Sequence, residues 1–72
     1  MTFVVGPLPP LPEVITQARR SARMTKVASA QSIWLSKRQW YRYEDGECEM
    51  PVGLWELFLI KARLPYDVKE SV

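Results

Sequence analysis

Six prolines divide this 72-residue sequence into segments that can and cannot form regular helices. Four of them lie in "GPLPPLP", residues 6–12, and the others are Pro51 and Pro65. Because proline lacks the backbone N–H and restricts the residue before it, this stretch excludes a regular helix or a central strand. Proline is tolerated at the first helical position, so Pro12 and Pro51 can each begin a helix. The prolines predict an extended arm over residues 1–11, a folded domain over residues 12–64 and a loose tail over residues 65–72.

The spacing of apolar residues between the prolines predicts helices and no strand. Apolar side chains recur every three or four residues, and Thr25 and Ser36 are suited to cap the helices that follow them. Gly46 is suited to end one. The predicted fold class is all-α, a compact four- to five-helix bundle. The expected helices span residues 12–22, 26–33, 37–45 and 51–64.

The segment "LSKRQWYRYEDG", residues 35–46, predicts a short helix with one aromatic and one basic edge. Ser36 and Gln39 form an S-x-x-Q capping box. Trp40 and Tyr43 are three residues apart, so both can face the core. The rest of the helix surface carries Lys37, Arg38, Tyr41 and Arg42.

The expected helix over residues 51–64 is apolar around nearly its whole circumference. Such a helix must be buried on several sides. Because a chain of this length forms only a small core, we expect one side to contact a second copy of the protein. The predicted contacts of this homodimer are Trp55, Phe58 and Leu59.

Opposite charges separate along the chain. Residues 1–42 carry seven Lys or Arg against Glu13 alone, a net charge of +6. Residues 43–72 carry three Lys or Arg against seven acidic residues, a net charge of −4. A basic half of this kind is suited to bind a polyanion, and a solvated charged surface is the alternative.

The residue inventory argues against an enzyme. The sequence has no His and one Cys, Cys48, so it supplies neither a metal cluster nor a nucleophile–base pair of the usual kind. Its three glycines are isolated, which excludes a glycine-rich phosphate loop. No cofactor, metal or small-molecule ligand is predicted. The proline-broken N-terminal stretch predicts neither a signal peptide nor a membrane span, and the lone cysteine suits the cytoplasm.

The region from Arg19 to Pro51 resembles the Xre family, the helix-turn-helix domains of the Cro and phage-repressor type. The residues that carry the resemblance are Arg19, Met24-Thr25-Lys26, Ala30, Ile33, Leu35-Ser36, Arg42-Tyr43-Glu44, Gly46-Glu47 and Pro51. It covers about half of the chain directly. The resemblance implies that the N-terminal end of the third helix enters the major groove of DNA.

Position by position, the resemblance implies three sets of residues. The base-reading side chains are Lys37, Arg38, Gln39 and Arg42. The phosphate contacts are Thr25, Lys26, Ser36 and Tyr41. The ion pair that ties the first helix to the third is Arg19 with Glu44. Two assignments have alternatives: Gln39 either reads a base or is held by its capping role, and Tyr41 contacts a phosphate, a thymine methyl or only solvent.

Four residues depart from the family pattern. Trp34 and Arg23 stand where relatives have glycine, and a left-handed backbone at Trp34 would cost ~1–2 kcal/mol. Glu47 and Glu49 lie in a loop where relatives carry phosphate-binding Lys or Arg. We therefore do not expect this loop to contact the DNA backbone.

The resemblance implies a sequence-specific transcriptional regulator, a repressor encoded by a phage or other mobile element. It would bind double-stranded DNA as a homodimer, at an inverted-repeat operator with half-sites ~34 Å apart. The alternative is an antitoxin or phage inhibitor that binds a host or toxin protein on the same scaffold, through its helical face, its arm or its acidic second half. A dimerisation domain without any ligand is a further alternative.

Overall fold

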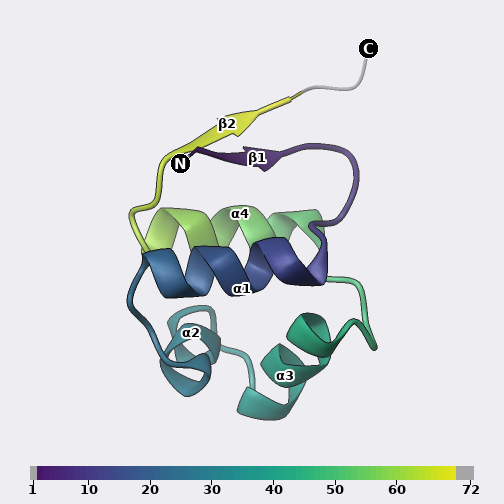
Figure 1. Ribbon diagram of the computed structural model, residues 1–72, viewed down its shortest axis with the longest axis vertical. Helices are drawn as coiled ribbons and strands as arrows, with labels where there is room; N and C mark the ends of the chain where they lie inside the picture. Colours follow the sequence, from purple (N-terminus) through teal and green to yellow (C-terminus); the bar gives the residue numbers. More distant parts are fainter. Residues whose placement is uncertain (1, 70–72) are drawn as a thin grey trace.

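Four helices and a two-stranded sheet make up the part of the chain that the computed structural model describes, residues 2–69. The sheet covers one end of the molecule, α1 and α4 form the middle layer, and α2 and α3 form the opposite end (Figure 1). The molecule measures 34 × 24 × 20 Å along its principal axes. In chain order the elements are β1 (Phe3–Val5), α1 (Pro12–Ser21), α2 (Lys26–Ser32), α3 (Lys37–Asp45), α4 (Val52–Lys61) and β2 (Tyr66–Val68).

One apolar core joins all four helices to β1. Its largest fully buried side chains include Trp40 of α3 and Trp55 and Phe58 of α4. The ring centroids of Trp40 and Phe58 lie 4.9 Å apart, which fastens α3 to α4. The prediction of a compact, mostly helical domain is confirmed.

The prediction that the chain contains no strand is wrong. β1 and β2 pair in parallel, with Phe3 beside Tyr66 and Val5 beside Val68. Phe3 and Val5 are buried while Val4 between them is exposed, because successive side chains of a strand point to opposite faces. The expected arm and tail are thus partly ordered as a sheet; residues 1 and 70–72 of those segments lie outside the described residues.

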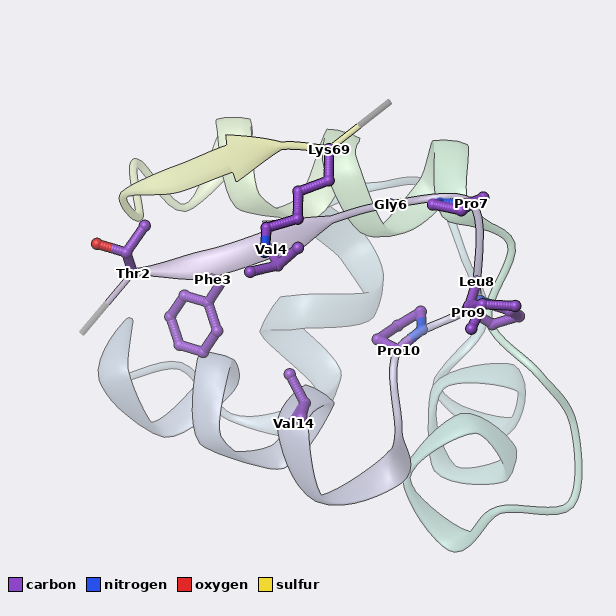
Figure 2. A pocket seen from close by; sticks show the side chains of 10 residues that line it. All are labelled: Thr2, Phe3, Val4, Gly6, Pro7, Leu8, Pro9, Pro10, Val14 and Lys69. Carbon is purple, nitrogen blue, oxygen red and sulfur yellow. The ribbon is translucent and has the colours of Figure 1, made fainter. Parts of the chain in front are cut away.

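Residues 6–11 connect β1 to α1 and follow the irregular path that their prolines predict. Between this segment, β1 and α1 lies an apolar hollow of about 410 Å³, with Phe3, Val4 and Val14 on its walls (Figure 2). Leu8 and Leu11 of the connecting segment are largely exposed.

The assignment of Trp55, Phe58 and Leu59 to a dimer interface is also wrong. All three side chains are buried inside a single chain. The cover expected from a second copy is supplied by β1. Phe3 packs edge-on against Trp55 at 5.9 Å between centroids, and the Trp55 indole N–H donates to the Val4 carbonyl at 3.0 Å.

The last helix is shorter than expected and ends at Lys61 rather than near residue 64. Arg63 adopts a left-handed conformation with φ of 58°, and the N–H of Leu64 donates to the carbonyl of Leu59 at 3.0 Å. This is the hydrogen bond of a left-handed helix C-cap. The chain therefore leaves the helix two residues before Pro65.

Candidate nucleic-acid interface

A tight turn joins α2 to α3 and sets the angle at which α3 leaves the body. The backbone of Trp34 is left-handed, with φ of 59°, and the N–H of Leu35 donates to the carbonyl of Ala30 at 2.9 Å. Trp34 is 77% exposed, and the ammonium of Lys61 lies 4.8 Å from its ring centroid. Although Trp34 replaces the glycine of the family pattern, the backbone here keeps the left-handed conformation that glycine would favour.

Side-chain oxygens cap both helices as predicted. The Thr25 hydroxyl accepts from the N–H of Ala28 at 3.1 Å, and the Ser36 hydroxyl accepts from the N–H of Gln39 at 3.2 Å. The reciprocal bond of the capping box, from the Gln39 side chain, is absent among residues 2–69. Gln39 is half-buried, and its amide group is not held by the capping interaction.

α3 turns one edge into the core and the other to solvent. Trp40 and Tyr43 are buried, whereas Lys37, Arg38 and Arg42 are exposed. These three cations, with Tyr41, Asp45 and Glu47, line a surface hollow of about 480 Å³. The predicted basic edge therefore protrudes from the fold, although two carboxylates border it.

Lys26 at the start of α2 reaches towards the same edge. Its ammonium lies 4.9 Å from the ring centroid of Tyr41, which is 40% exposed. This cation–π contact brings two of the predicted phosphate-binding residues together. Thr25 and Ser36 are exposed, and each hydroxyl still has its proton available to donate after accepting the capping bond.

The Glu44 carboxylate anchors α3 to α1. It accepts hydrogen bonds from the Arg19 guanidinium at 2.8 Å, the Thr16 hydroxyl at 2.7 Å and the Trp40 indole N–H. Arg19 also donates to the carbonyl of Met24 at 3.2 Å, so the same side chain holds the turn before α2. The predicted Arg19–Glu44 ion pair is present and positions the basic edge.

The surroundings of Glu44 lower its pKa. Burial by itself raises the pKa of this carboxyl. The hydrogen bonds from Arg19, Thr16 and Trp40, together with the charge of Arg19, outweigh burial, so the pKa lies below its ordinary value. Glu44 is therefore ionised in the folded protein at neutral pH.

Three contacts at this candidate site were missed by the sequence reasoning. Thr16 lies three residues before Arg19 on α1, and Trp40 lies four before Glu44 on α3; this helical spacing could have placed both beside the carboxylate. The third contact is Arg42 with Glu47, whose nearest nitrogen and oxygen lie 3.9 Å apart. Both side chains are exposed, so this weak pair lies at the border of the basic edge and does not fix Arg42 there.

Residues 2–69 contain no group of three or more His, Cys, Asp or Glu side chains that could hold a metal ion. In the same range, no helix is both long enough and apolar enough to cross a membrane. A scan against protein-family models and a search of curated proteins return no match for this chain.

Proposed function

We propose that this protein is a sequence-specific, double-stranded DNA-binding transcriptional regulator in which α2, the turn and α3 act as a helix-turn-helix. The observation that carries the proposal is the division of α3: Trp40 and Tyr43 are fixed in the core while Lys37, Arg38 and Arg42 extend into solvent. A helix with this arrangement can enter a groove without losing its attachment to the fold. We further propose that the regulator is a phage or mobile-element repressor that excludes RNA polymerase sterically.

The dimensions of α3 suit the major groove of B-DNA. An α-helix with its side chains is about 10–12 Å across, and the groove is about 12 Å wide. Arg38 and Arg42 lie four residues apart on one edge, so both planar guanidinium groups can reach base edges, where guanine O6 and N7 accept two hydrogen bonds. Gln39, whose amide group is not held by the cap, can pair with adenine.

The phosphate contacts in this proposal surround the base-reading edge. Lys26 and Tyr41 lie side by side, and the hydroxyls of Thr25 and Ser36 can donate to phosphate oxygens. The carboxylates of Asp45 and Glu47, at the C-terminal end of α3, border the same hollow and would repel the DNA backbone there. The contacted stretch of DNA is therefore short, and one chain reads half of an inverted-repeat operator.

Selection of bound duplexes from a random pool tests the proposal directly. We expect enriched sequences with two-fold symmetry and half-site centres ~34 Å apart. A pool without enrichment, together with no salt-sensitive binding, would count against DNA recognition and favour a protein-binding antitoxin or inhibitor.

Two variants separate base reading from phosphate binding. Arg38→Ala should cost ~1–3 kcal/mol on the selected duplex and relax the preference at one base pair. Lys26→Ala should weaken selected and random duplexes alike. Arg20→Ala is the matched control, because Arg20 is exposed on α1 and lines a different hollow. Equal losses on both duplexes for Arg38→Ala would show that it does not read a base.

A further inference from the structure

The outer edge of β2 is an unpaired strand edge. In the parallel pair, Phe3 N–H donates to the Pro65 carbonyl at 3.0 Å and Lys69 N–H donates to the Val5 carbonyl at 2.7 Å. Since alternate residues of a strand bond to opposite sides, the N–H and carbonyl of Val68 point away from β1. No further strand lies on that side within residues 2–69. An edge of this kind is a template for pairing with another strand.

Charges on either side of Val68 make this edge complementary to itself. Asp67 and Lys69 are both exposed. When two β2 strands run antiparallel with Val68 facing Val68, Asp67 of each copy lies opposite Lys69 of the other. Opposite charges across strands are stabilising, whereas a register centred on Asp67 or Lys69 would place like charges face to face. The sequence therefore favours one register.

The apolar side chain of Val68 also lacks cover. Its register partner Val5 is buried, so both side chains lie on the face of the sheet towards the helices, yet Val68 is 56% exposed at the open edge. Because successive side chains of a strand alternate between its faces, Asp67 and Lys69 lie on the face opposite Val68. Figure 2 shows the Lys69 side chain extended from the end of β2 to Val4 of β1. Pairing around Val68 would bring two valines together on the inner face and place the charge pairs on the outer face.

We propose that the protein forms a two-fold dimer by antiparallel pairing of β2 with β2 of a second copy, which gives the strand order β1-β2-β2-β1. In this arrangement the Val68 residues exchange both backbone hydrogen bonds, and each dimer contains two Asp67–Lys69 pairs. The interface uses backbone groups of Val68 that the single chain leaves unpaired, and the exposed Lys69 side chain turns from its position beside Val4 to the outer edge.

The position of the sheet links this dimer to DNA recognition, and this step rests on the proposed function. The two-fold axis of an antiparallel strand pair runs perpendicular to the sheet. Because the sheet lies at one end of the molecule and α3 at the other, the two copies stand side by side with both α3 helices at the same end (Figure 1). Two half-sites on one face of a duplex require that arrangement.

Charge-reversal variants test the interface by analytical ultracentrifugation without DNA. Asp67→Lys and Lys69→Asp should each raise the dimer Kd about tenfold or more, because each change places like charges opposite one another twice. An equimolar mixture of the two variants should form a heterodimer with a Kd near that of the wild type, and the double variant should recover its own homodimer. A merely structural role for either residue predicts no such recovery.

Val68→Pro tests the backbone contact separately. It removes an N–H that points away from β1, so the protein should keep its far-UV circular dichroism and sediment as a monomer. If this variant unfolds, the charge-reversal mixture decides the question. A wild-type monomer at the highest soluble concentration, or mixed variants that associate no better than each alone, overturns the proposed interface.

The two proposals fail differently. A dimer that responds to charge reversal but binds no DNA supports the interface and overturns the DNA-binding function. If the protein binds DNA specifically but charge reversal at Asp67 and Lys69 leaves its dimer Kd unchanged, the function is supported and the interface is overturned.

Discussion

At the scale of single residues, three helices end on a left-handed residue that is not glycine. Arg23, Trp34 and Arg63 have φ values of 56°, 59° and 58°. In each case the next residue donates its N–H back to a carbonyl of the preceding helix, at 2.9–3.1 Å, as in helix C-caps. The conformation costs ~1–2 kcal/mol for a residue with a Cβ. The fold thus carries backbone strain at three comparable positions.

Replacing Arg23 with glycine should relieve this strain. Arg23→Gly removes ~1–2 kcal/mol of strain from the folded state. Glycine also makes the unfolded chain more flexible, which lowers the stability by roughly 0.5–1 kcal/mol, so the net free energy of unfolding should rise by about 0.5–1 kcal/mol. Urea unfolding measures the change. The control Arg20→Gly, inside α1, should instead lower the stability by about 1 kcal/mol. A loss of stability in Arg23→Gly would show that the arginine side chain stabilises the fold by more than its left-handed backbone costs.

Ser29 is a buried polar residue without a partner. Its hydroxyl oxygen is fully buried and makes no hydrogen bond among the described residues. Ser29→Ala should therefore raise the free energy of unfolding by about 1 kcal/mol, since it removes an unsatisfied polar group. Ser32→Ala is the control, because the Ser32 hydroxyl donates to the Ser29 carbonyl at 2.7 Å and its loss should be destabilising. A lower thermal midpoint for Ser29→Ala would contradict this prediction.

At the scale of elements, the attachment of α3 depends on the charge of Glu44. Its pKa is lowered in the folded state, so the ion pair contributes its full stability above the ordinary value near 4.5 and loses it as the pH falls through the lower folded-state pKa. Glu44→Gln should cost about 3 kcal/mol at neutral pH, because it leaves Arg19 buried without its counter-charge.

The pH dependence of unfolding checks this prediction. The stability difference between wild type and Glu44→Gln should shrink as the pH is lowered below about 4.5, and it should be constant between pH 5 and 7. The control Glu49→Gln, in the exposed loop before α4, should leave the free energy of unfolding at neutral pH within about 0.5 kcal/mol of the wild-type value. A constant difference down to the acid transition would exclude Glu44 as the titrating group.

The helices were predictable from sequence for local reasons, and the strands were not. Thr25, Ser36 and the apolar spacing encode their helices within a few residues. Strands of three residues are too short to show a period of two, and their pairing joins Phe3 to Tyr66 at opposite ends of the sequence. The misassigned dimer contacts follow from this omission, because Trp55 seemed uncovered without β1. Residue type alone also gives no sign that Arg63 is left-handed.

At the scale of the whole molecule, the charges that we assign to DNA lie at the end formed by α2 and α3. Lys26, Lys37, Arg38 and Arg42 of two copies bring eight cations to the DNA, which sets an upper limit of about eight neutralised phosphates. The logarithm of the binding constant should then fall with the logarithm of salt concentration, with a slope no steeper than about −7. Lys26→Ala should reduce that slope by about 2 in the dimer. A slope near zero would exclude an electrostatic interface at this end.

The parallel pairing of β1 with β2 has a consequence for the order in which the chain folds. Phe3 and Val5 are made early by the ribosome, but their strand partners Tyr66 and Val68 come more than sixty residues later. All four helices lie between the two strands in the sequence, so they are synthesised before β1 can pair with β2 above Trp55. During that interval β1 has no strand partner to hold Phe3 against Trp55, so the cover over this indole is completed only when Tyr66–Val68 joins it.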